Sequence, residues 1–154
     1  MKKVIYYITK GRCYTMKENA IYLAAPWFTP EQEDLYDHVV AVLRAVFGSY
    51  AVYVPREHVI ENGDNLPNHI WGQTVFIDDY EAIRKCDFVY AIDWGFTADS
   101  GTAWEVGAAY ALGKSINIIK PDVVDIQSLM LLGSCRHVYN ECFNELLPHE
   151  LEWK

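Results

Sequence analysis

The chain has 154 residues, 51% of them hydrophobic and 22% charged, a composition that fits one globular domain with a single core. A formal net charge of −8, without a cluster of Lys and Arg, argues against binding to the phosphate backbone of a nucleic acid polymer. No apolar run reaches the roughly 18–20 residues of a membrane span, and the N-terminus lacks the long apolar stretch of a signal peptide, so we predict a cytoplasmic protein with no membrane partner.

Strand and helix signals alternate along most of the chain. Short apolar runs predict buried strands, and segments with helical periodicity or capping signals lie between them. One such signal is Thr29 followed by Pro30 and Gln32, the pattern of a capping box with proline at the first helical position. The predicted strands are 20–25, 50–55, 87–93, 116–119 and 137–139, and the predicted helices are 30–47, 70–85, 99–113 and 126–132.

This alternation predicts an α/β fold, a doubly wound parallel sheet of about five strands with helices on both faces. We predict a single domain over residues 19–154, preceded by an N-terminal extension of residues 1–18 that contains an ambiguous strand signal at 4–9. Ligands of such sheets bind beyond the carboxyl ends of the strands. The segments that converge there are 22–29, 78–80 and 99–105.

The segment after the strand at 87–93 carries one carboxylate, Glu105, among small and apolar residues. An unpaired buried carboxylate costs several kcal/mol or changes its protonation state, so its presence needs a reason. We expect Glu105 near the start of a helix, where the partial positive charge of the helix N-terminus favours the ionised form. From this stretch alone, the alternative is an ordinary surface glutamate on an amphipathic helix.

Carboxylates and aromatic side chains gather at the same predicted edge. A carboxylate nucleophile, a second carboxylic acid and flat apolar surfaces suit cleavage of a glycosidic bond to a leaving group with a π-face, such as a nucleobase. Structural alternatives are packing for the aromatic residues, a solvated helix face for Asp79 and a helix N-cap for Asp99. Neither the four cysteines nor any glycine-rich loop forms a metal or dinucleotide motif, so we predict no metal site and no nicotinamide dinucleotide. The candidate residues are Tyr22, Trp27, Phe28, Asp79, Asp99 and Glu105.

Taken together, these residues resemble the nucleoside 2-deoxyribosyltransferase family over about residues 20–132. The similar segments are Ile21–Thr29, Tyr53–Pro55, Asp78–Ile83, and Asp99–Gly113, in which an acidic residue precedes the glutamate by six positions. The resemblance implies a flavodoxin-like fold and transfer of 2-deoxyribose between nucleobases. It also implies a ping-pong reaction through a covalent deoxyribosyl-glutamate, without a cofactor.

The resemblance implies a role for each candidate residue. Glu105 would be the nucleophile and Tyr22 would orient it, while Asp79 would protonate the leaving base and deprotonate the incoming one. The implied substrate-binding residues are Asp99 at the 5′-hydroxyl of the sugar, Trp27 and Phe28 against the base, and Ser128.

Two positions depart from the family pattern. Ser128 stands where the family has an Asn donated by a neighbouring subunit, which implies a homo-oligomer, a dimer or a hexamer. A serine there is similar to the related deoxynucleoside-monophosphate N-glycosidases, but Asp99 would repel a 5′-phosphate and favours nucleosides. Val59 stands where the family often has a base-binding Gln. Its substitutes are Glu57, His58 or Asn62, and the base preference stays open.

Other functions remain alternatives at this stage. One is a nucleoside hydrolase or a deoxynucleoside 5′-monophosphate N-glycosidase on the same fold, which would release a base without an acceptor. Another is a non-catalytic domain that binds a nucleotide derivative, in which Glu105→Ala would leave the affinity intact. The partners expected from the favoured interpretation are small nucleosides and free nucleobases.

Overall fold

The computed structural model describes residues 5–9, 12–142 and 146–147. Its main sheet has the strand order β4-β3-β5-β6-β7-β8, and the first five strands are parallel. In chain order this is the 2-1-3-4-5 arrangement of flavodoxin-like folds, which confirms the predicted architecture. The strands are β3 (Ile21–Ala24), β4 (Val52–Tyr53), β5 (Phe88–Ile92), β6 (Ser115–Lys120), β7 (His137–Asn140) and the short antiparallel β8 (Leu146–Leu147).

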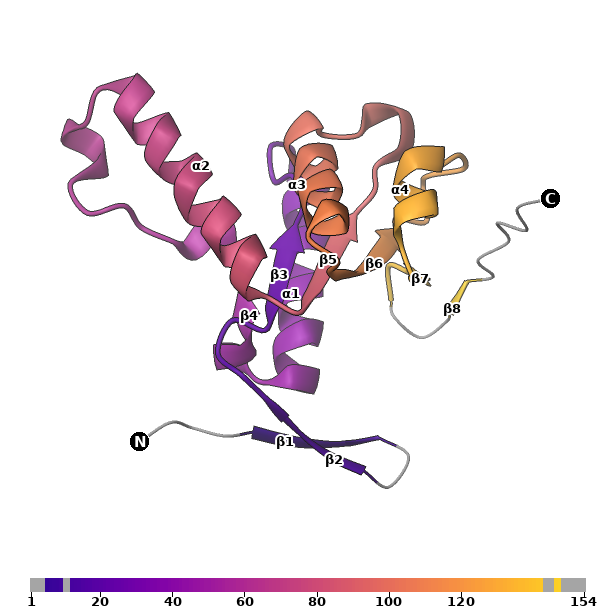
Figure 1. Cartoon of the computed structure of the whole chain (residues 1–154). Coiled ribbons are helices and arrows are strands. Elements are labelled where there is room, and N and C mark those ends of the chain that lie inside the picture. Colours follow the sequence, from indigo (N-terminus) through magenta and orange to yellow (C-terminus); the bar gives the residue numbers. More distant parts are fainter. Residues whose placement is uncertain (1–4, 10–11, 143–145, 148–154) are drawn as a thin grey trace.

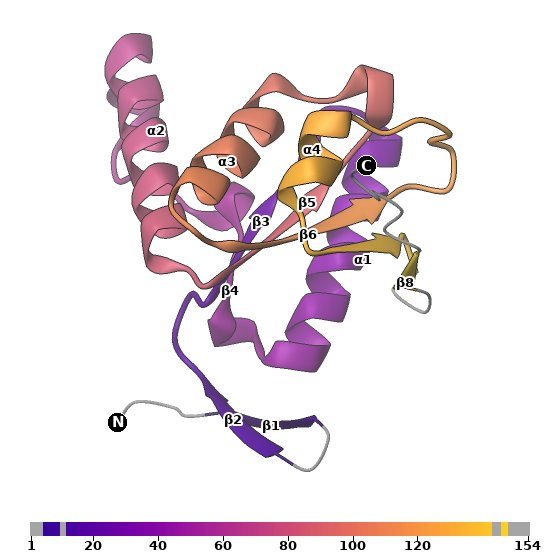
Figure 2. The same cartoon turned by 45° about the vertical axis from the view of Figure 1, so that its right-hand side comes forward.

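Helices cover both faces of this sheet (Figures 1 and 2). Successive residues of β3 explain the two layers, because side chains alternate between the faces of a strand. Ile21 and Leu23 join a core cluster with α1, whereas Tyr22 and Ala24 join a cluster with the other helices. The helices are α1 (Pro30–Phe47) on one face, and α2 (Asn68–Lys85), α3 (Ser100–Ala111) and α4 (Leu129–Ser134) on the other.

The predicted helix boundaries of α1 and α3 are set by local signals. Thr29 Oγ1 accepts from the Gln32 backbone N–H at 3.3 Å, and Gln32 Oε1 accepts from the Phe28 backbone N–H at 2.9 Å. The side chain of Gln32 therefore reaches one residue further back than in the standard capping box. After α3, Gly113 has φ +70° and the Lys114 N–H bonds to the Ala109 carbonyl at 2.9 Å, the geometry of a glycine helix terminus.

Two predicted elements differ from the structure. The strand expected at 50–55 is reduced to β4, because Ser49–Ala51 forms a 3₁₀ turn directly after Gly48. The helix expected at 126–132 is α4, which begins at Leu129. The delay has a long-range cause, since the buried Asp93 carboxylate accepts from Gln127 Nε2 at 3.4 Å and from the Ser128 N–H at 3.3 Å.

Helix α2 packs differently from its neighbours. Only Ala82 and Ile83, near its C-terminal end, are buried, and the rest of the helix projects beyond the sheet (Figure 1). The segment 54–67 runs alongside it as an irregular connection with two 3₁₀ turns, Pro55–Glu57 and Gly63–Asn65. This projecting helix and its loop form one wall of the candidate site.

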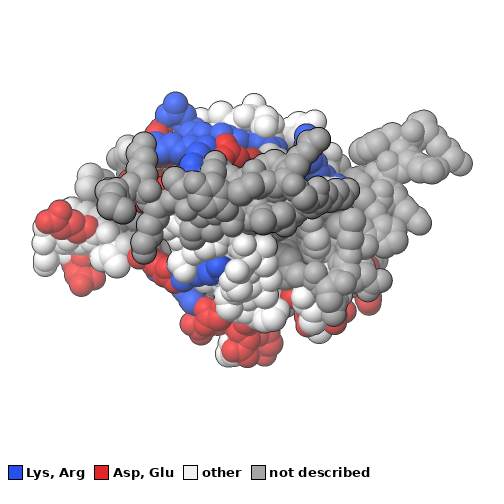
Figure 3. Space-filling model, turned by 90° about the horizontal axis from the view of Figure 1, so that it is seen from below, with Lys and Arg blue, Asp and Glu red and all other residues white. Residues whose placement is uncertain are grey.

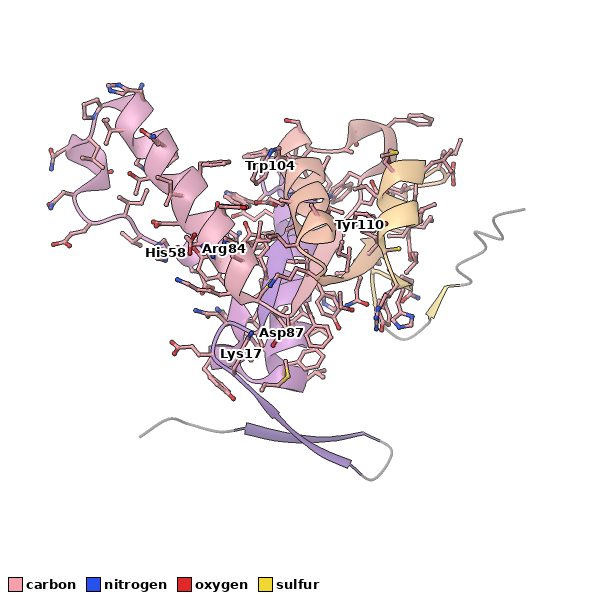
Figure 4. The ribbon with its side chains drawn as sticks, viewed as in Figure 1. Lys17, His58, Arg84, Asp87, Trp104 and Tyr110 are labelled. Carbon is pink, nitrogen blue, oxygen red and sulfur yellow. The ribbon has the colours of Figure 1, made fainter. Side chains whose placement is uncertain are left out.

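An N-terminal hairpin extends from the edge where the parallel strands begin (Figure 1). It consists of β1 (Ile5–Thr9) and β2 (Arg12–Met16), so the described part of the ambiguous strand signal at 4–9 forms a strand. Residues 1–4, 10–11, 143–145 and 148–154 lie outside the described residues. An ion pair of 2.6 Å between Lys17 Nζ and Asp87 Oδ1, two residues labelled in Figure 4, ties the end of the hairpin segment to the start of β5. The division into residues 1–18 and 19–154 stays a prediction.

The surface carries charges of both signs. On the face shown in Figure 3, most of the Lys and Arg side chains gather near the upper edge, while Asp and Glu occupy the left and lower margins. Within the described ranges, every helix is too short or too polar to serve as a membrane span.

Candidate active site

A short hydrogen bond joins Tyr22 on β3 to Glu105 on α3. The Tyr22 hydroxyl donates to Glu105 Oε1 at 2.6 Å, and the tyrosine is fully buried. Because β3 and β5 are neighbours and α3 follows β5, the helix carries Glu105 over the face of the sheet on which Tyr22 lies. The structure therefore brings together the two residues that the sequence suggested as nucleophile and positioning group.

The electrostatics of Glu105 differ from the expectation. Burial raises the pKa of Glu105 to about 8, the hydrogen bond from Tyr22 opposes this change, and the negative charges of Asp79 and Asp99 add to it. Glu105 is the sixth residue of α3, and the field of a helix N-terminus weakens beyond the first turn. The expectation that the helix terminus favours an ionised Glu105 is therefore wrong, since burial outweighs it.

Tyr53 connects this pair to Asp79. It lies in register with Tyr22 on the adjacent strand, and the two rings stack with centroids 5.6 Å apart and planes 12° apart. The Tyr53 hydroxyl donates to Asp79 Oδ1 at 3.4 Å. Glu105, Tyr22, Tyr53 and Asp79 thus form one connected series. Sequence reasoning missed Tyr53 as a site residue, although its place near the end of a predicted strand neighbouring that of Tyr22 was an available signal.

The two acidic residues at the C-terminal half of α2 have different partners. Burial raises the pKa of Asp79 to about 6, against the lowering effects of the Tyr53 hydrogen bond and of His58, while Asp78 raises it slightly further. Asp78 instead faces His58, with 3.3 Å between Asp78 Oδ2 and His58 Nε2. His58 lies beside α2 in Figure 4. Asp79 is therefore the acidic residue of α2 that belongs to the series leading to Glu105.

A cavity of about 730 Å³ opens beside Asp79, between the loop after β3, the segment 55–65 and α2. Trp27, Phe28 and Asp79 all contribute to its lining, whereas Tyr22 and Glu105 do not. Phe28 is 73% exposed, and Trp27 packs edge-on against Tyr36 with centroids 5.3 Å apart. The volume lies in the range of about 300–1,000 Å³ that is typical of small-molecule sites.

Asp99 caps α3. Its Oδ2 accepts from the Thr102 backbone N–H at 2.7 Å and from Thr102 Oγ1 at 3.0 Å. A Cβ at position 101 would lie 2.9 Å from the same oxygen, so Gly101 leaves room for this cap. The N-cap role weighed from the sequence is thus observed. Asp99 also lies close enough to Glu105 for its negative charge to contribute to the raised pKa of Glu105.

Ser128 lies apart from the cavity. It is the N-cap residue of α4 and its backbone N–H bonds to Asp93, a carboxylate that is 1% exposed. Asp93 also accepts from the Gly95 N–H at 2.9 Å, and a Cβ at Gly95 would lie 2.5 Å from the Ile126 carbonyl oxygen. The loops before α3 and α4 are therefore in direct contact. In the sequence, the signal for a structural role of Asp93 was its charge at the end of an otherwise apolar predicted strand.

The three candidate substitutes for a base-binding Gln occupy different surroundings. Glu57 binds Arg44 through both carboxylate oxygens, at 2.9 and 2.5 Å, whereas His58 and Asn62 line the cavity. His58 and Asn62 are thus the better placed of the three. In the part of the chain that the structure describes, no group of three His, Cys, Asp or Glu side chains is arranged to hold a metal ion.

The chain is similar to known proteins of one family. A family model described as nucleoside 2-deoxyribosyltransferase matches residues 21–145. A nucleoside deoxyribosyltransferase of Lactobacillus leichmannii is 25% identical over 115 residues, 70% of this chain and 73% of that protein. The structure of a 2-deoxyribosyltransferase from Bacillus psychrosaccharolyticus is 32% identical, with a TM-score of 0.66, and covers 81% of this chain and 90% of that one. A CMP N-glycosidase of Clostridium botulinum, at 21% identity and a TM-score of 0.50 over 78% of this chain and 85% of that one, shares the fold alone.

Proposed function

This chain belongs to the nucleoside 2-deoxyribosyltransferase family, and from that premise we propose that it transfers 2-deoxyribose between nucleobases through a covalent intermediate on Glu105. The observation that carries the proposal is the 2.6 Å hydrogen bond from Tyr22 to Glu105 Oε1. This bond holds one carboxylate oxygen and leaves Oε2 to attack. Tyr53 then links the pair to a second carboxyl group, Asp79, in the wall of a ligand-sized cavity.

In the first half-reaction, Glu105 Oε2 attacks C1′ of a 2′-deoxynucleoside. The bond between C1′ and the base nitrogen breaks, its electron pair stays on the base, and Asp79 donates a proton to that base. In the second half-reaction an incoming base gives a proton to Asp79 and attacks C1′, which releases the Glu105 carboxylate. A sugar without a 2′-hydroxyl favours this route, because it forms the oxocarbenium-like transition state more easily.

Glu105 and Asp79 share one proton between about pH 6 and 8, and it lies mainly on Glu105, so the reactive form with the proton on Asp79 is the less populated one. The reaction requires an ionised Glu105 and a protonated Asp79, whose pKa values are about 8 and about 6. Below the lower value both groups are protonated and Glu105 cannot attack. Above the higher value both are ionised and Asp79 cannot donate. We therefore expect a bell-shaped dependence of kcat/KM on pH with limbs near these two values.

The remaining predicted residues complete the substrate site in this proposal. Trp27 and Phe28 stack against the base, and Asp99 Oδ1 holds the 5′-hydroxyl of the sugar while Oδ2 caps α3. Ser128 serves the site of a neighbouring copy in a homo-oligomer, consistent with its distance in the fold from the lining of the cavity of its own chain. We also propose that the enzyme acts in the cytoplasm and that residues 1–18 are an addition to the catalytic domain.

A second candidate is an N-glycosidase, in which water takes the place of the acceptor base. Ser128, in place of the expected Asn, favours it, since hydroxyl groups suit a 5′-phosphate. Asp99 opposes a phosphate at the same site. The transferase therefore stays the main proposal, and the two activities differ in whether a new nucleoside forms.

The test is a chromatographic assay of 2′-deoxyinosine with and without adenine. We expect 2′-deoxyadenosine only when adenine is present, and none from Glu105→Ala. Glu81→Ala, which removes a surface carboxylate paired with Arg84, is the matched control and keeps the activity. Intact-mass measurement after mixing with the nucleoside alone should detect one added deoxyribosyl group. Hypoxanthine release without a new nucleoside would support the N-glycosidase, and activity of Glu105→Ala would refute the proposed nucleophile.

A further inference from the structure

The cavity beside Asp79 continues along α2 well beyond the acid. Trp71, Val75 and Asp79 are spaced by four residues, so they share one face of the helix, and all three line the cavity. At 1.5 Å per residue, Trp71 lies about 12 Å along the helix axis from Asp79. A base whose ring nitrogen receives a proton from Asp79 therefore leaves the part of the cavity near Trp71 empty.

This far part of the cavity, between Val75 and Trp71, has apolar side chains that face open space, and the polar residues Asn62, Asp64 and Asn65 also line the cavity. Trp71 is 48% exposed and Val59, on the opposite segment, is 85% exposed. The turn at Gly63 packs against Trp71, since a Cβ there would lie 3.4 Å from Trp71 Cδ1 and 3.5 Å from Ile60 Cβ. Exposed apolar side chains that converge on one cavity are typical of a ligand site.

We propose that this far part, the distal pocket, binds a bulky apolar substituent on the nucleobase, preferably an aromatic one. The inference rests on the proposed function, which puts the base between Asp79 and the aromatic pair Trp27 and Phe28. A purine bound to the sugar through N9 directs its 6-amino edge away from the sugar. An arylmethyl group on that nitrogen extends toward Trp71, where the indole offers a stacking surface.

The two parts of the cavity recognise different features of the base. The part near Asp79 recognises any base that accepts a proton, and the part near Trp71 adds affinity only for a base that is extended. Val75 lies one helical turn from each of the other two residues. A large side chain at position 75 would therefore close the distal pocket without replacing Asp79.

The experiment is calorimetric binding of adenine and of N6-benzyladenine to the full-length protein. We expect N6-benzyladenine to bind the wild type about tenfold more tightly than adenine, from burial of the added ring. Trp71→Ala should reduce that preference, and Val75→Trp should abolish it while the affinity for adenine stays within about twofold. Ile77→Ala, an exposed apolar residue of α2 outside the cavity lining, is the matched control and should keep the preference.

The outcomes separate this inference from the proposed function. Equal affinities of the two bases for the wild type, or a preference that persists in Val75→Trp, would overturn the distal pocket. Thermal melts of each variant exclude loss of folding as the cause. Failure to transfer deoxyribose to adenine counts against the proposed function instead, and the ratio of the two binding constants still decides whether the distal pocket exists.

Discussion

The two helices that carry the proposed catalytic carboxylates are held in different ways. Helix α3 is packed on the sheet along most of its length through Thr102, Val106 and Ala109, whereas α2 is buried only at Ala82 and Ile83. The pKa values of the two carboxyl groups reflect this difference in packing. Burial raises the pKa of Glu105 to about 8 and that of Asp79 only to about 6. The proposed nucleophile is thus partly buried on a well-packed helix, and the proposed acid lines a ligand cavity.

The largest effect should come from the acid on α2. Asp79→Asn removes the proton donor, and we expect kcat for deoxyribosyl transfer from 2′-deoxyinosine to adenine to fall about 100- to 10,000-fold. Asp78→Asn is the matched control, because Asp78 pairs with His58 instead of Tyr53, and it should lower kcat by less than about tenfold. Equal losses in the two variants would contradict the assignment of the acid.

On α3, the hydrogen bond from Tyr22 is the next test. Tyr22→Phe removes the group that holds Glu105 Oε1, and we expect kcat/KM to fall about 10- to 100-fold. The same bond lowers the pKa of Glu105, so its loss should move the alkaline limb of the pH profile upward from about 8. A fall in rate without this movement of the limb would indicate a packing role for Tyr22.

The raised pKa of Glu105 makes the free energy of unfolding depend on pH. Its pKa rises from 4.5 to about 8 on folding, so the folded protein binds the proton more tightly than the unfolded chain. The corresponding stability is fully present below about pH 4.5 and is lost as the pH rises through about 8. Glu105→Gln should therefore increase the free energy of unfolding by about 2–4 kcal/mol above that range and change it little below it, as measured by urea denaturation. A gain of the same size at every pH would contradict this account.

The smallest effect should come from replacing Tyr53, which stacks on Tyr22 and donates a hydrogen bond to Asp79 on α2. Its bond to Asp79 is long at 3.4 Å, so Tyr53→Phe should lower kcat/KM only about two- to fivefold. Because that bond lowers the pKa of Asp79, the acidic limb of the profile should move upward from about 6. An unchanged acidic limb would mean that Tyr53 acts only through stacking.

Much of the fold could be predicted from the sequence, because short apolar runs and capping residues are local signals. Thr29 and Gly113 mark the ends of their helices in both the sequence and the structure. The start of α4 could not be predicted, since it depends on Asp93, a residue 35 positions before Ser128 in the chain.

The resemblance to a family supplied the pairing of Tyr22 with Glu105. Two features of the site were not apparent at that stage, the stacking of Tyr53 and the position of Trp71. The first depends on strand register and the second on the path of the segment 54–67.

The stacked phenol rings of Tyr22 and Tyr53 lie between the proposed acid, Asp79, and the proposed nucleophile, Glu105. Their centroids are 5.6 Å apart on adjacent strands, whose separation of about 4.8 Å varies little among proteins. In the proposed reaction, the separation of the two carboxyl groups therefore depends on the spacing of β3 and β4 as well as on the position of α2. If the proposed function holds, changes in the segment 54–67 can alter which bases are accepted while Tyr22, Tyr53 and Glu105 keep their positions on the sheet and α3. Base preference could then be engineered largely apart from the nucleophile.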